Sequence, residues 1–195
     1  MKVLVIKGSP RAQGNSSLLM EEVLNGLKEK GKEGLEINTI NPYQLDINPC
    51  INCDNCQQEL KCIFDDDMND LYMKFDRSDI ILVATSIYFN GTPAKLKAMI
   101  DRCQLIWSSK YIFDNSIIKR DKQRIGYLLA TGGAPEYDEQ FCCIKKVMKM
   151  FFKVINTDFK NKLLISNVDK KPVKNRKKIL NKAYQIGLDL TEAFN

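Results

Sequence analysis

The N-terminal segment of the chain places an apolar strand, a loop rich in glycine and serine, and a helix in direct succession. The apolar run 3–6 is followed by the loop 8–17 and by apolar residues at helical spacing over 16–30. The first turn of a helix has unpaired backbone N–H groups and carries the positive end of the helix dipole. This order therefore predicts an anion site at the helix N-terminus, and phosphate is the anion that we expect.

Residues 8–17, which we call the phosphate loop, supply the donors that a phosphate requires. Gly8 lets the backbone turn tightly, and Arg11 offers a charged fork for phosphate oxygens. The loop matches neither G-x-G-x-x-G nor G-x-x-x-x-G-K-[ST], so it indicates neither a dinucleotide fingerprint nor an NTPase loop. An ordinary strand-to-helix turn with a serine cap is the alternative. The phosphate-binding candidates are Ser9, Arg11, Gly14, Asn15, Ser16 and Ser17.

Strand and helix patterns alternate along the rest of the chain. We expect strands over 2–7, 35–40, 80–84, 125–130 and 163–165, and helices over 16–30, 68–75, 93–106, 138–154 and 174–193. Residues 41–66 and 107–123 are expected to be irregular, and the second of these segments is a candidate for packing against another subunit. The alternation predicts an α/β, doubly wound, flavodoxin-like sandwich around a five-stranded parallel sheet in the order 2-1-3-4-5.

Length and composition limit the class of protein. A chain of 195 residues predicts one domain, 1–195, with a cysteine-rich insertion at about 46–66. No apolar run reaches about 18 residues, and the N-terminus reads as a strand, so we expect a cytoplasmic protein without a membrane segment. The formal charge is +6, with much of the basic excess between residues 160 and 182. Aromatic residues do not alternate with it, so we expect a solvated helix face and no nucleic-acid binding. A second interpretation of this basic excess is that it attracts anionic substrates or an acidic redox partner.

The chain contains no histidine. This excludes a Ser-His-Asp triad, a Cys-His pair and every zinc site that uses histidine. Any metal must be bound by cysteine or carboxylate side chains. Catalysis therefore requires another acid or base, or a cofactor that carries the chemistry itself.

Four cysteines lie within the insertion, namely Cys50, Cys53, Cys56 and Cys62. Two successive x2 spacings followed by a fourth cysteine are similar to ferredoxin spacing, so a 4Fe-4S cluster is our first interpretation. A structural zinc site is the second, although its ligands usually come as two separated pairs. Thiols without a metal are the third. The remaining cysteines, Cys103, Cys142 and Cys143, are expected to be small buried apolar residues.

Two further loops follow expected strands and should reach the same sheet edge as the phosphate loop. These are the second loop, 85–91, and the third loop, 131–133; the cysteine segment should emerge there as well. Aromatic side chains in the second loop can stack on a flat ring, and a Thr-Gly-Gly edge lets a ring lie close to the backbone. Together with a phosphate, this predicts a flavin, most simply FMN. The ring-binding candidates are Ile87, Tyr88, Phe89, Asn90, Gly91, Thr131, Gly132 and Gly133.

With these residues assembled, the chain resembles the NAD(P)H-dependent FMN reductase family, and its iron–sulfur flavoprotein branch most. The resemblance rests on the phosphate loop, on the segment 88–102 and on the cysteines followed by Asp66-Asp67-Met68, and it covers residues 2–134 well. It implies that the phosphate loop holds the FMN phosphate, that the other two loops contact the ring, and that the four cysteines bind the cluster. Ser86 departs from the family, which more often has proline there.

The resemblance implies an FMN-dependent oxidoreductase that uses NAD(P)H to reduce a flavin, quinone or similar acceptor. Because the flavin carries the chemistry, no catalytic side chain is expected. The first alternative is a non-enzymatic electron carrier that is reduced by a ferredoxin-like protein. The second is a binding module in which the four cysteines hold zinc. A homodimer or homotetramer is expected, with electron exchange between FMN and the cluster, across a subunit interface as the family implies.

Overall fold

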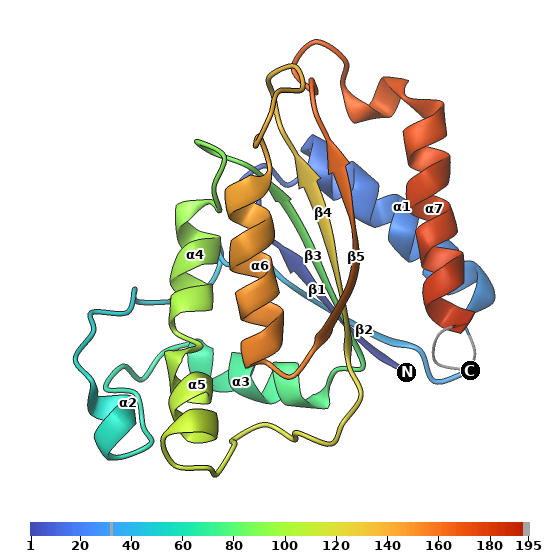
Figure 1. The fold of residues 1–195 in the computed structure, drawn as a ribbon. Coiled ribbons are helices and arrows are strands. Elements are labelled where there is room, and N and C mark those ends of the chain that lie inside the picture. The colour runs from blue at the N-terminus through green and yellow to red at the C-terminus, as the bar shows by residue number, and fades with distance from the viewer. Residues whose placement is uncertain (32, 193–195) are drawn as a thin grey trace.

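The computed structural model describes residues 1–31 and 33–192, and its centre is a five-stranded parallel sheet in the order β2-β1-β3-β4-β5 (Figure 1). The strands are β1 (Lys2–Lys7), β2 (Glu36–Ile40), β3 (Ile80–Ser86), β4 (Ile125–Thr131) and β5 (Asp158–Ile165). The helices are α1 (Asn15–Lys30), α2 (Asn55–Gln58), α3 (Met68–Arg77), α4 (Ala94–Asp101), α5 (Gln104–Tyr111), α6 (Cys142–Val154), the short η1 (Val173–Asn175) and α7 (Lys177–Glu192). The predicted α/β class and strand order are confirmed.

Two apolar cores lie on the two faces of the sheet, because successive side chains of a strand point to opposite sides. Leu4 and Ile81 pack in the core under α3, α4, α5 and α6, whereas Val3 and Ile80 pack in the core under α1 and α7 (Figure 1). The central strands are therefore buried on both faces, as in other parallel sheets. Within the described part of the chain, no helix is long and apolar enough to cross a lipid bilayer.

Helices α1 and α7 pack closely against each other, and each has a glycine at the contact. A Cβ atom on Gly26 of α1 would lie 2.1 Å from the carbonyl oxygen of Tyr184, and one on Gly187 of α7 would lie 2.0 Å from that of Val23. Both neighbours are backbone atoms, which cannot move aside without shifting a helix. The close approach therefore requires that these positions carry no side chain.

Gly26→Ala is expected to lower the free energy of unfolding by about 1–3 kcal/mol, because overpacking forces the two helices apart. A urea denaturation curve measures the change. Asn25→Ala, at the exposed neighbouring position of the same helix, is the matched control and should change stability by less than about 0.5 kcal/mol. Equal effects from the two substitutions would contradict the packing argument.

The expected helix over 93–106 is in fact two helices, and the prediction of one continuous helix is wrong. Helix α4 ends at Asp101 and α5 begins at Gln104. The hydroxyl of Tyr72 donates a hydrogen bond of 2.9 Å to the carbonyl of Arg102, which occupies an acceptor at the break. Because α5 continues to Tyr111, the start of the segment 107–123 is helical and not irregular.

Three other expectations need correction. Helix α6 begins at Cys142 and not at residue 138, because Glu139 has a left-handed backbone with φ of +63°. Strand β5 begins at Asp158 and not at residue 163, since its exposed polar positions hide the strand pattern while the backbone still pairs with β4. Cys103 is buried as expected, but Cys142 is partly exposed and Cys143 is exposed, so the expected burial of this pair is wrong.

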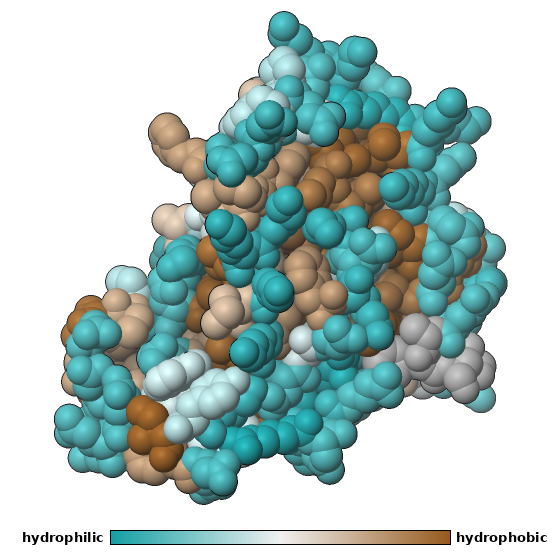
Figure 2. Space-filling model, viewed as in Figure 1, coloured by the Kyte–Doolittle hydropathy of each residue, from teal (hydrophilic) through white to brown (hydrophobic). Residues whose placement is uncertain are grey.

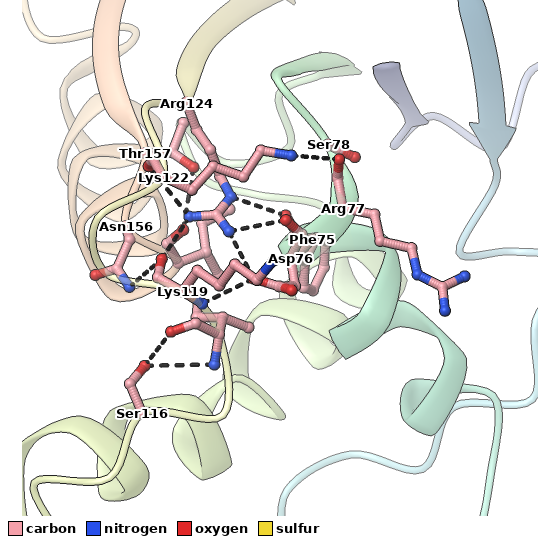
Figure 3. A network of polar contacts seen from close by, with 12 residues as sticks. Phe75, Asp76, Arg77, Ser78, Ser116, Lys119, Lys122, Arg124, Asn156 and Thr157 are labelled. Carbon is pink, nitrogen blue, oxygen red and sulfur yellow. Dashed lines mark hydrogen bonds and ion pairs between the residues drawn. The ribbon is translucent and has the colours of Figure 1, made fainter. Parts of the chain in front are cut away.

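A buried arginine ties the irregular connection before β4 to the end of α3 (Figure 3). The Arg124 side chain is fully buried and pairs with Asp76 at 2.6 Å. It also donates hydrogen bonds to the carbonyl oxygens of Phe75 and Asp76 in the last turn of α3 and to that of Lys119. A cation at a helix C-terminus is favoured by the helix dipole. This part of the connection is therefore held by contacts within its own chain.

Candidate functional site

The phosphate loop is anchored to the end of β3. The amide of Gly8 donates a 2.7 Å hydrogen bond to the carbonyl of Ala84, and the hydroxyl of Thr85 donates to the Gly8 carbonyl at 3.0 Å. A Cβ on Gly8 would lie 2.5 Å from the Leu96 side chain. The loop therefore passes close to Leu96 of α4, which leaves little space for a side chain at the first position of the loop.

The N-terminus of α1 presents its amides without a side-chain cap. Gly14 is the N-cap residue, no side chain accepts from the first-turn amides, and the first turn has no acidic residue. The hydroxyl of Ser17 instead donates to the Arg11 carbonyl at 3.3 Å, inside the loop. The carboxamide oxygen of Asn15 accepts from the amide of Val173 at 2.8 Å and so fixes the loop to η1. The result is an electropositive helix end of the kind that binds phosphate.

A cavity of about 270 Å³ lies against this helix end, at the carboxyl edge of the sheet. All three predicted loops reach it, together with the loop that follows β5. Its position beside β1 and β3 is the switch point of the sheet, where α/β folds of this kind bind ligands. The lining residues are Ser9, Arg11, Gly14, Asn15, Ser16, Ser86, Ile87, Tyr88, Thr131, Gly133, Val168 and Asp169.

The second loop is a tight two-residue turn. Tyr88 and Gly91 exchange backbone hydrogen bonds of 3.2 and 2.9 Å, and the two residues between them have φ of +48° and +61°. Phe89, at the tip, is fully exposed, and Asn90 accepts a hydrogen bond from the Tyr137 hydroxyl. Of the five residues predicted here, Ile87 and Tyr88 line the cavity, and the other three form the turn that supports them.

The third loop contributes its first and last residues to the cavity. Thr131 and Gly133 line it, whereas Gly132 is backed by Gln140, whose amide nitrogen would lie 2.9 Å from a Cβ at that position. A Cβ on Gly133 would lie 2.3 Å from a carboxylate oxygen of Asp169. Both glycines therefore leave room for neighbouring side chains, and at Gly133 the carboxylate of Asp169 fills that room.

Three lining residues were not among the predicted candidates. The hydroxyl of Ser86 is buried and has no hydrogen-bond partner among residues 1–31 and 33–192. Val168 and Asp169 reach the cavity because their amides donate to the carbonyls of Gly132 and Gly133, at 3.1 and 3.3 Å. The available signal was topological, since the loop after the fifth strand must end at the same sheet edge as the other three.

The four cysteines of the insertion line one second cavity, together with Phe64, Arg102, Gln104 and Leu105. Left-handed backbone at Asn52, Asp54 and Leu60 curls the segment around this space. The hydroxyl of Ser108 on α5 donates to the sulfur of Cys56 at 3.5 Å. No three Cys, Asp or Glu side chains in the described portion of the chain are close enough to share one metal ion. The four thiols therefore face one common space.

A buried ion pair holds the cysteine segment against α4. Arg102 pairs with Asp66 at 2.5 Å, both side chains are 1% exposed, and Arg102 also donates to the Asn48 carbonyl at 2.8 Å. Burial opposes ionisation of Asp66, but the hydrogen bonds from Arg102 and from the amides of Asn48 and Met68 outweigh it and lower the pKa of this carboxyl. The segment is thus fixed at its two ends by one guanidinium group.

The sequence predicts that the cysteine segment lies at the carboxyl edge of the sheet, and this prediction is wrong. The segment turns back along the side of the molecule, and α2 packs on α5, at the far end of α4 from the second loop (Figure 1). The two cavities have no lining residue in common. The reason is that the long connection after β2 follows α4 downward, where Arg102 and Ser108 bind it.

Comparison with known proteins gives concordant matches. The family model described as NADPH-dependent FMN reductase matches residues 1–136. An iron-sulfur flavoprotein of Methanocaldococcus jannaschii is 41% identical over 102 residues, which are 52% of this chain and 51% of that protein. The iron-sulfur flavoprotein of Methanosarcina thermophila is 32% identical over 134 residues, 69% of this chain and 64% of the relative. The chain thus spans about half to two thirds of the length of these relatives.

The fold itself has close counterparts among solved structures. A crystal structure of an azoreductase from Bacillus anthracis superposes with a TM-score of 0.74, covering 97% of this chain and 99% of that one, at 18% identity. At this level of identity the likeness concerns the fold alone.

Proposed function

Because the chain belongs to the NADPH-dependent FMN reductase family, we propose that it is an FMN-containing oxidoreductase that uses NADPH or NADH to reduce a flavin, quinone or similar acceptor. The observation that carries the proposal is the cavity at the N-terminus of α1. There, an uncapped helix end and the unpaired hydroxyl of Ser86 meet in one space. These groups suit a ligand with both a phosphate and a polar ring.

The residues present fit FMN at both ends. The first-turn amides of α1, with Ser9, Ser16 and Arg11, would hold the phosphate. The backbone of Ile87, Thr131 and Gly133 would lie along the ring, and the Ser86 hydroxyl would bond to its polar edge. When bound, FMN supplies hydride acceptance from a reduced nicotinamide and electron transfer in pairs or singly. The protein contributes orientation and fixed dipoles.

Arg11→Ala is expected to weaken FMN binding by about 1.5–3 kcal/mol, since a charged hydrogen bond to phosphate is lost. This corresponds to a rise in Kd of roughly 10- to 150-fold, measured by titrating the apoprotein with FMN. Arg77→Ala removes an exposed arginine at the end of α3, remote from the cavity, and serves as the control. An unchanged Kd for Arg11→Ala would remove this residue from the site.

A nicotinamide donor has space beside the flavin cavity. A hollow of about 660 Å³ between α6 and α7 has an apolar floor and a polar rim (Figure 2). Lys145, Lys171 and Arg176 line it, and the Nε atom of Arg176 is buried with no partner in the described residues. These basic groups suit the phosphates of a dinucleotide, whereas the carboxylates of Glu136, Asp138 and Glu139 in the same lining oppose them. Spectra of anaerobic protein before and after NADPH test the proposed reaction, since rapid loss of the flavin absorbance would support it.

For the cysteine segment, we propose a 4Fe-4S cluster bound by Cys50, Cys53, Cys56 and Cys62. A single zinc ion binds each sulfur at about 2.3 Å, which would bring all four thiols together around one point. In a cubane each cysteine binds a different iron, so the thiols stand further apart around a larger space. All four thiols line one cavity, which supports a shared centre, and the spacing of the cysteines along the chain favours the cluster over zinc. When bound, the cluster supplies one-electron transfer, and the Ser108 hydroxyl bonded to Cys56 is a group that tunes its potential.

A non-enzymatic electron carrier reduced by a ferredoxin-like protein is the second candidate function. It is favoured by the exposed lysines of β5 and α7, among them Lys160, Lys162, Lys177 and Lys178, which would attract an acidic partner. Bleaching of the flavin by reduced ferredoxin but not by NADPH would support this candidate.

The separation of the two cavities in one chain is the reason to propose a homodimer or homotetramer, in which neighbouring subunits exchange electrons.

A further inference from the structure

We propose that Cys142 and Cys143 form a vicinal dithiol site for a soft trivalent metalloid, such as an arsenical with one organic substituent. These are the first two residues of α6, and their sulfur atoms lie 3.6 Å apart. Cys143 is exposed and Cys142 is partly exposed. The proposed function uses neither residue, and neither lines the flavin cavity or the cysteine cavity.

The separation of the two sulfurs fits a single shared centre. With bonds of about 2.3 Å, the length of a zinc–thiolate bond, sulfurs 3.6 Å apart subtend about 100° at the atom between them. This angle is close to that of a pyramidal trivalent centre. In the described parts of the chain, no third Cys, Asp or Glu joins the pair in a metal-binding group. The site therefore suits a centre that needs only two protein ligands.

The binding reaction is an exchange of ligands. An organic arsenical in water carries two hydroxyl groups on trivalent arsenic, and each thiol replaces one of them. Two arsenic–sulfur bonds form, two arsenic–oxygen bonds break, and the two thiol protons leave with the hydroxyl groups as two water molecules. No electrons are transferred, so the reaction needs no oxidant or reductant.

The thiols of Cys142 and Cys143 can be reached by a reagent from solvent, whereas the thiol of Cys103 is buried. Cys103 lies 3% exposed between α4 and α5, where burial raises the pKa of its thiol. Cleavage after Arg124 and Lys145 releases the peptide 125–145, which contains both proposed ligands and no other cysteine. Cleavage after Arg102 and Lys110 releases 103–110, which contains Cys103 alone. Peptide mapping can therefore assign an adduct to either site and separate both from the cysteine segment.

The test treats the reduced, cofactor-loaded protein with phenylarsine oxide under anaerobic conditions and maps the adducts by mass spectrometry. We expect one adduct on peptide 125–145 and none on 103–110, stable to excess glutathione and removed by a dithiol. Cys142→Ser and Cys143→Ser should each weaken binding at this peptide by about 100-fold or more, because the second bond of the chelate is lost.

Circular dichroism and FMN content of both serine variants should equal those of the parent protein, which separates loss of binding from misfolding. Absence of the adduct from 125–145 would overturn the proposal. Undiminished binding by either single serine variant would also overturn it, because one thiol would then suffice.

Discussion

Replacing Cys53 with serine is expected to abolish incorporation of the cluster while leaving FMN in place. The cysteine lies in the exposed part of the segment and lines the cavity shared by all four thiols. Serine is a weaker ligand for iron than a cysteine thiolate, so one corner of the cluster would lose its protein ligand. After anaerobic reconstitution with iron and sulfide, iron and acid-labile sulfide should fall to background, and the broad visible absorbance beyond that of flavin should disappear.

The matched control is Cys143→Ser, which removes another exposed thiol outside the segment. It should retain the iron content of the parent protein. Iron content that is unchanged in Cys53→Ser would exclude this residue as a ligand. Stoichiometric zinc and no iron in the parent protein would instead favour the zinc alternative.

Asp66→Ala is expected to lower the free energy of unfolding by about 3–5 kcal/mol, because it leaves the buried guanidinium of Arg102 without its counter-charge. This would be one of the largest single effects in the chain, and it should also reduce iron retention, since the pair fixes the cysteine segment. Denaturation in urea measures the stability. Asp65→Ala, at the exposed neighbouring position, should cost less than about 1 kcal/mol.

The same pair predicts a dependence of stability on pH. The pKa of Asp66 is lower in the folded protein than in the unfolded chain, where it is about 3.9. Its contribution is therefore present above the unfolded pKa and is lost as the pH falls through the folded pKa. In Asp66→Ala the acid-induced loss of stability below about pH 4 should be shallower than in the parent protein. Parallel pH profiles would contradict this account.

The sequence predicted well both the sheet and the position of the loop 8–17 before a helix, because both depend on local patterns. Continuous apolar runs mark strands buried on both faces, and a glycine-rich turn before a helix marks an anion site. Prediction from the sequence failed where contacts between residues distant in the chain determine the local structure. Tyr72, which is distant in sequence, donates a hydrogen bond at the break between α4 and α5, and Arg102 binds the cysteine segment along its path. The sequence shows Ser86 only as a departure from the family pattern. The structure places its unpaired hydroxyl in the cavity.

The loop that follows β5 has a consequence for a flavin bound in the cavity. The family match ends at residue 136, yet Val168 and Asp169 complete the cavity from beyond it. A carboxylate at this wall places negative charge beside the ring site, where it would disfavour electron uptake and lower the reduction potential of a bound flavin. The C-terminal third of the chain would thus contribute to the electrical environment of a flavin bound in this cavity.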